Sequence, residues 1–118
     1  MAVGVLRKSG GAVVCERCEI ADTPLKRMRG LLGRDGLEPG EAMLFRPAGS
    51  IHTMFMRFPL DVLFCDRELV VVGIERDLKP WRTAGRRGAK VVVELAVGAA
   101  EGLEVGDRLF LETATMNA

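Results

Sequence analysis

The sequence has few of the residues that usually mark a functional site, with no tyrosine, one tryptophan and one histidine among 118 residues. It contains no glycine-rich phosphate loop, no G-x-S-x-G nucleophile elbow, and no helix-turn-helix, RRM or KH signature. Charge is balanced as well, because 17 basic and 16 acidic residues leave a net charge of +1. Nothing global therefore points to nucleic acid or to a membrane surface as the partner.

Long hydrophobic runs are also missing. The longest, such as LVVVGI, fall far short of the roughly 20 residues of a membrane helix, and Arg7 and Lys8 come too early for a secretory signal. The three cysteines are an odd number, which argues against a disulfide framework and fits a reducing compartment. We therefore expect a cytoplasmic protein that has no contact with a membrane.

The hydrophobic share of the chain, 48%, is enough to build one core over residues 1–118, which we expect to form a single domain. Short apolar runs bounded by turn residues predict seven to eight short strands in a curled sheet or partly closed barrel, which would hide most sheet edges. The fold class is thus α+β, mainly β. The predicted strands cover residues 2–7, 12–20, 41–45, 51–57, 60–65, 69–75, 90–97 and 108–113.

One short helix is predicted near residues 24–32. Thr23 is a good N-cap, Pro24 suits the first helical position, and Gly33 is a natural stop. The predicted apolar face of this helix consists of Leu25, Met28 and Leu32.

Several segments together resemble a known family. RGLLGR, GEAMLF, IHTMFMRFPLDVLFCD, PWR and ELAVGAAEGLEVGD occur in this order over about residues 16–112, and the chain is similar to the prokaryotic domain of unknown function family 192. The resemblance implies a compact, mainly β fold and no particular reaction. Where many members carry Trp-Met-x-Asn-Thr, this chain has residues 52–56, so no role of that Asn-Thr pair carries over. The chain matches the His-Thr and Met-Arg-Phe-Pro branch instead.

The segment SIHTMFMRFPLDVLF, residues 50–64, holds the most informative polar residues. With the two-residue period of a strand, Arg57 and Asp61 share one face, and a bend at Pro59 would aim both at one ligand. Asp61 lies between apolar neighbours and needs a partner. That partner is either a ligand or an internal one, such as backbone N–H groups or an ion pair. His52 is either a site residue or a satisfied structural histidine.

The segment from 77 to 90 is the longest irregular stretch, and residues 76–90 are rich in arginine and lysine. Trp81 either anchors this loop by packing or stacks on a partner, and Arg82 would lie beside it. A basic loop with one aromatic residue can also grip phosphates and stack a base.

The pair Cys15-x-x-Cys18, with Cys65 and His52, has the composition of a structural zinc site. Its setting argues against zinc, because residues i and i+3 of a strand point to opposite faces. No helix begins there to lower a thiol pKa for redox work. We therefore expect no metal and no cofactor.

The leading hypothesis is a small binding or accessory domain whose cleft is formed by residues 50–61 and 76–87. Its ligand would be an unknown small molecule or protein. An alternative is a hydrolase or metal-dependent enzyme that uses His52 and Asp61, and another is an anion or nucleic-acid module that uses residues 76–90, although nucleic acid is the less favoured partner. No catalytic residue and no oligomeric state is predicted. The predicted binding residues are His52, Arg57, Asp61, Trp81 and Arg82.

Overall fold

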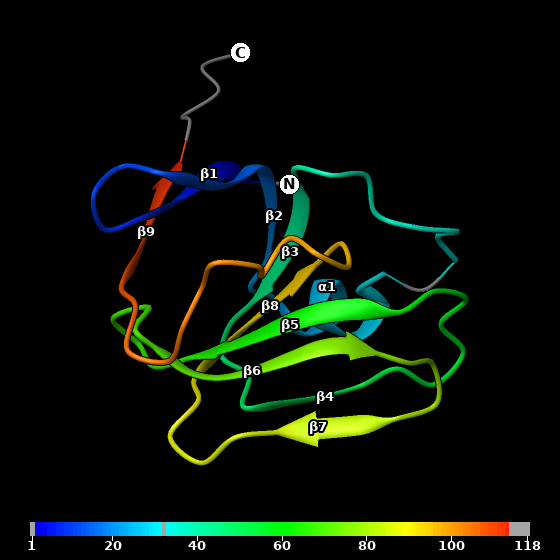
Figure 1. Cartoon of the computed structure of the whole chain (residues 1–118). Coiled ribbons are helices and arrows are strands. Elements are labelled where there is room, and N and C mark those ends of the chain that lie inside the picture. The colour runs from blue at the N-terminus through cyan, green and yellow to red at the C-terminus, as the bar shows by residue number, and fades with distance from the viewer. Residues whose placement is uncertain (1, 32, 114–118) are drawn as a thin grey trace.

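A curled seven-stranded sheet dominates the computed structural model, which describes residues 2–31 and 33–113 (Figure 1). Its strands lie in the order β6-β5-β8-β3-β2-β1-β9, and only β2 and β3 pair in parallel. Strands β4 and β7 form a separate two-stranded sheet. The strands are β1 (Val3–Lys8), β2 (Val13–Ala21), β3 (Glu41–Phe45), β4 (Ser50–His52), β5 (Leu60–Cys65), β6 (Val71–Leu78), β7 (Thr83–Gly85), β8 (Val91–Leu95) and β9 (Leu109–Thr113).

The large sheet curls until its two edge strands touch at one end. Val70 and Arg108, which precede β6 and β9, form an isolated antiparallel bridge. Next to it, the Val71 N–H donates to the carbonyl of Asp107 at 2.8 Å. The sheet is thus a partly closed barrel, which confirms the mainly β fold class predicted from the sequence.

The central strands are buried on both faces, so the sheet has two cores. In β5, Leu63 and Cys65 face the inside of the curl. Val62 and Phe64 face the opposite side, which is the second face of the sheet. Strands buried on both faces read as continuous apolar runs, and β5 and β8 have this character. The second face is the one that carries the pocket described below.

Helix α1 (Pro24–Arg29) begins as predicted and ends early. The Thr23 side chain accepts from the Lys26 N–H, and Gly30 ends the helix with φ near 47°. The predicted apolar face was wrong, because Leu25 and Met28 are 75% and 74% exposed and Leu31 is buried instead. Leu32, the third residue of the predicted face, lies outside the described residues.

The predicted strand 51–57 was also wrong in its extent. Strand β4 ends at His52, and Phe55 adopts φ near 65°, a left-handed backbone that no strand accommodates. The short strand β7 was not predicted and lies in the segment expected to be irregular. The two short strands pair antiparallel, with Ile51 opposite Ala84, which brings the segments 50–52 and 83–85 side by side.

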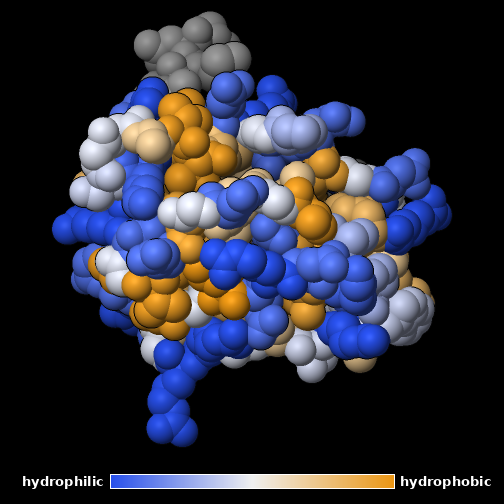
Figure 2. Space-filling view, viewed as in Figure 1, coloured by the Kyte–Doolittle hydropathy of each residue, from blue (hydrophilic) through white to orange (hydrophobic). Residues whose placement is uncertain are grey.

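Hydrophilic and hydrophobic residues are interspersed on the face drawn in Figure 2, in keeping with the balanced charge of the chain. Within residues 2–31 and 33–113, no helix is both long and apolar enough to cross a lipid bilayer.

Candidate functional site

Glu94 is a carboxyl group in the middle of the apolar strand β8. Its neighbours Val93 and Leu95 point into the curl of the sheet, so Glu94 points to the second face, as Val92 does. The residue is 6% exposed, and no described residue donates a hydrogen bond to its Oε2 atom. Burial raises the pKa of Glu94 from 4.5 to about 8. An unpaired buried carboxyl is costly, so this position calls for an explanation.

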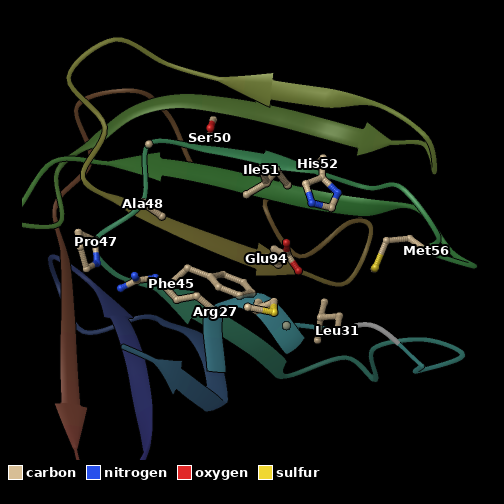
Figure 3. A pocket seen from close by; sticks show the side chains of 13 residues that line it. Arg27, Leu31, Phe45, Pro47, Ala48, Ser50, Ile51, His52, Met56 and Glu94 are labelled. Carbon is tan, nitrogen blue, oxygen red and sulfur yellow. The ribbon is translucent and has the colours of Figure 1, made fainter. Parts of the chain in front are cut away.

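The Glu94 side chain lies in a pocket of about 330 Å³ between the sheet, α1 and β4 (Figure 3). In the close-up, the carboxyl points into the cavity from the sheet, and the imidazole of His52 extends toward it from β4. Arg27 lines the pocket from α1, and the walls combine apolar and polar surface in similar amounts. The lining consists of Arg27, Met28, Gly30, Leu31, Phe45, Pro47, Ala48, Gly49, Ser50, Ile51, His52, Met56 and Glu94.

Two glycines allow the walls of the pocket to approach closely. A Cβ atom on Gly30 would lie 3.3 Å from the ring of Phe45, so the end of α1 sits directly on that ring. A Cβ atom on Gly49 would lie 3.0 Å from the carbonyl oxygen of Ala89. The lack of side chains at these positions brings α1 and the segment before β4 toward the sheet around Glu94.

Thr53 fixes the segment that carries His52. Its side chain is fully buried, and its hydroxyl donates to the Lys79 carbonyl at 2.6 Å and accepts from the Arg82 N–H at 2.8 Å. The Thr53 backbone N–H donates to the Arg82 carbonyl at 2.7 Å, and its carbonyl accepts from the Trp81 N–H at 2.9 Å. The side chain and backbone of Thr53 thus join segments 50–61 and 76–87, which the sequence predicted to share a cleft.

Replacing Thr53 by Val is expected to destabilise the protein by about 1–2 kcal/mol, because the Arg82 N–H and the Lys79 carbonyl lose their hydroxyl partner. Urea denaturation measures the change, and Thr53→Ser, which keeps the hydroxyl, is the matched control. Equal midpoints for Thr53→Val and the wild type would show that these hydrogen bonds contribute nothing.

The structure separates the five predicted binding residues. His52 lines the pocket and is exposed at its rim. Arg57 instead forms an exposed ion pair with Asp35, with 2.9 Å between Nη1 and Oδ1. Neither Trp81 nor Arg82 lines the pocket around Glu94. The two segments lie together, and of the five predicted binding residues the pocket around Glu94 is lined by His52 alone.

Asp61 is enclosed by internal hydrogen bonds. The residue is 2% exposed, and its Oδ1 accepts from the Asp77 N–H at 2.9 Å. Its Oδ2 accepts from the N–H groups of Gly98 and Ala100 at 3.0 and 3.1 Å. Asp61 faces the inside of the curl, and it does not line the pocket around Glu94. Of the two roles that the sequence allowed, acceptance from backbone N–H groups is the one seen.

Trp81 lies at the surface beside another aromatic residue. Its side chain is 57% exposed and that of Phe55 is 71% exposed, and the ring centroids are 4.8 Å apart. Both residues have a left-handed backbone, with φ near 65°. Arg82 donates from its guanidinium to the Trp81 carbonyl at 3.3 Å.

Two of the basic residues in 76–90 make contacts with other parts of the protein. Arg76 donates to the carbonyls of Ala100 and Leu103. Arg86 pairs with Glu75 at 2.7 Å and stacks over the Phe64 ring. These contacts account for basic residues that the sequence alone left available for phosphate.

The cysteine pair departs from the expected geometry. Cys15 and Cys18 were expected on opposite faces of a strand, and that expectation was wrong, because both are buried in the core inside the curl. The pairing of β1 with β2 is irregular here, since Gly4 faces Cys18 and Leu6 faces Cys15, which leaves one extra residue in β2. A hydrogen bond with the Cys18 thiol lowers the pKa of Cys15, and the same contact raises the pKa of Cys18.

We expect protein purified without chelator to contain well below one zinc ion per chain. Cys15 donates its thiol to the carbonyl of Gly40 at 2.9 Å, and no group of three or more His, Cys, Asp or Glu residues in the described ranges is placed to hold a metal. Elemental analysis tests this, with Cys15→Ser as the matched sample. About one zinc per wild-type chain and none in the variant would contradict the prediction.

The model of the DUF192 family, described as an uncharacterised ACR, matches residues 5–111. The chain belongs to the DUF192 family. This confirms the resemblance seen in the sequence, and the description of the family names no reaction.

Relatives of this DUF192 chain include archaeal UPF0127 proteins. One from Pyrococcus abyssi is 37% identical over 117 residues, covering 91% of this chain and 97% of the relative. One from Thermococcus sibiricus is 36% identical over 115 residues, covering 89% and 72%.

Two solved structures share the fold of this DUF192 chain. A candidate transcription regulator from Sinorhizobium meliloti has a TM-score of 0.80 at 25% identity, over 93% of this chain and 92% of the other. A protein of unknown function from Novosphingobium aromaticivorans has a TM-score of 0.77 at 26% identity, over 93% and 84%.

Glu94 is the site residue that sequence reasoning missed, although a signal for it was present. The run VVVEL places one carboxyl among apolar residues, and the argument that drew attention to Asp61 applies equally to it. The sequence does not reveal that Asp61 finds three backbone donors, whereas the Oε2 atom of Glu94 accepts no hydrogen bond from a described residue.

Proposed function

We propose that this protein binds a small organic molecule in the pocket between α1, β4 and the second face of the sheet. The unpaired, buried carboxyl of Glu94 carries this proposal. An unpaired buried carboxyl does not stabilise the folded state, and a ligand with hydrogen-bond donors would supply the missing partner. A concave cavity that has apolar walls and a few converging polar groups is the usual form of a small-molecule site.

The ligand is small, because a cavity of about 330 Å³ lies at the lower end of the range for such sites. Apolar walls from Leu31, Phe45 and Ile51 would hold its body. Glu94 at the base and His52 at the rim would orient its polar groups. The three cysteines are free and buried, which supports the cytoplasm, a reducing compartment, as the place of this binding protein.

The test is a screen of small aromatic and aliphatic fragments, both charged and neutral, followed by NMR of the backbone amides of the full chain. Hits are expected to perturb Ile51, His52 and Glu94 and to compete with one another. Ala48→Phe, which fills the pocket, should abolish these shifts. Ala12→Phe, at an exposed position that does not line the pocket, is the matched control. Fragments that bind Ala48→Phe as they bind the wild type, or that perturb only other surfaces, would refute the proposal.

A further inference from the structure

We propose that the ligand of this pocket is an organic amine bound as its ammonium ion, with the charged nitrogen against the carboxylate of Glu94. This inference rests on the proposed function and specifies the class of the ligand. Two observations support it. Glu94 offers a buried hydrogen-bond acceptor at the base of the pocket, and no described residue donates a hydrogen bond to its Oε2 atom.

The base of the pocket offers a hydrogen-bond acceptor without a donor. The Oε2 atom of Glu94 is buried and accepts no hydrogen bond from a described residue. An ionised carboxylate only accepts, and it accepts most strongly from charged N–H groups. An ammonium group brings both the donors and the opposite charge.

The basic residues around the pocket do not neutralise Glu94. Arg27 of α1 and His52 of β4 are the other titratable residues of the lining. Arg27 donates to the carbonyl of Arg46 at 3.4 Å, and burial is the sole cause of the raised pKa of Glu94. On the sheet itself, Glu94 is flanked by Met43 of β3 and Val62 of β5, which carry no charge.

The walls suit an amine with an apolar body. Phe45 presents an aromatic ring to the pocket, and Leu31, Ile51 and Met56 are further apolar lining residues. An aromatic face attracts an ammonium ion, and apolar walls hold the carbon skeleton attached to it. One ring with a short amine-bearing chain fits the small size of the cavity.

Binding of an ammonium ion would be coupled to the release of a proton. Free Glu94, with a pKa near 8, is mostly protonated at pH 7, and the carboxylate is the form that pairs with the ligand. The apparent affinity follows the ionised fraction, so Kd is expected to fall about 50-fold between pH 6 and pH 8. An aliphatic amine stays charged over this range. In His52→Gln, which removes the imidazole from the rim, the dependence on pH should persist.

The experiment compares three probes that share a ring and differ in their polar group, namely benzylamine, benzyl alcohol and benzoate. Each is titrated into the full chain at pH 7.5, and Kd is obtained from the amide shifts of Ile51, His52 and Glu94. Benzylamine is expected to bind at least about tenfold more tightly than either of the others. Glu94→Gln, which keeps the shape of the side chain, should remove this preference.

The outcomes separate this inference from the proposed function. If benzyl alcohol or benzoate binds in the pocket as tightly as benzylamine, the amine assignment is wrong and the small-molecule site stands. If benzylamine binds best but with the same Kd at pH 6 and pH 8, pairing with Glu94 is refuted. If none of the three probes and no fragment of the screen perturbs the pocket, the proposed function fails as well.

Discussion

Glu94→Gln is expected to make the protein more stable than the wild type at pH 9, by about 5 kcal/mol, and about equally stable at pH 4. The pKa of Glu94 is about 8 in the folded state, against an ordinary value of 4.5. Between these values the unfolded chain has lost the proton and the folded chain keeps it, so stability falls as pH rises. Gln resembles the protonated form at every pH and avoids this loss.

Urea denaturation at half-unit steps from pH 4 to pH 9 measures the effect. The stability that protonated Glu94 contributes is fully present below pH 4.5 and is lost as pH rises to about 8, so the two curves should diverge over this window and then run parallel. Glu101→Gln, which changes an exposed carboxyl, is the matched control and should follow the wild type. A constant difference between Glu94→Gln and the wild type at every pH would mean that Glu94 titrates normally.

The class of fold was predictable because most strands are marked by patterns of neighbouring residues in the sequence. Apolar runs between turn residues marked most strands of the large sheet within one or two residues of their observed ends, as for 41–45 and 60–65. Strand β7 was missed because its three residues Thr-Ala-Gly have no strand pattern, and it exists only through pairing with β4. The pairing order, with β8 between β5 and β3, joins distant segments and leaves no local sign.

The start of the helix was predictable from the sequence, but its end was not. Thr23 and Pro24 are local signals, and they marked its start correctly. Its end was set by Gly30, which packs on Phe45 from β3, a contact that nothing in residues 24–33 discloses. Met28 was predicted as a core residue, yet it is exposed and lines the pocket, because the helix covers only the edge of the second core.

The candidate site was predictable in part, since His52 stood out as the single histidine and does line the pocket. Asp61 and Glu94 are alike in sequence, each a lone carboxyl in an apolar strand. They differ in which face of the sheet they occupy and in what lies over that face. Backbone N–H groups of the turn after β8 cover Asp61, and a cavity covers Glu94. Only the arrangement of distant segments decides which of the two is available to a ligand.

Asp61→Ala is therefore expected to be strongly destabilising, by about 3–5 kcal/mol, because it leaves three N–H donors without their acceptor. These bonds tie β5 to the end of β6 and to the turn that follows β8, which closes one end of the curled sheet. In a domain with a total stability of about 5–15 kcal/mol, the loss is a large fraction. The midpoint and slope of urea unfolding measure it.

Two further variants show whether the charge and the donors of this network are responsible. Asp61→Asn keeps one acceptor oxygen, which can serve Gly98 and Ala100, and turns its NH₂ group toward the Asp77 N–H, so it should lose less than Asp61→Ala. Asp66→Ala is the matched control, since Asp66 also accepts two backbone N–H bonds, but within its own turn between β5 and β6. It should lose about 1 kcal/mol.

Because Asp61 lies outside the pocket, Asp61→Asn should still bind benzylamine with the wild-type Kd. If its Kd rises instead while its stability is unchanged, Asp61 belongs to the binding site and its hydrogen bonds are not what holds this end of the sheet.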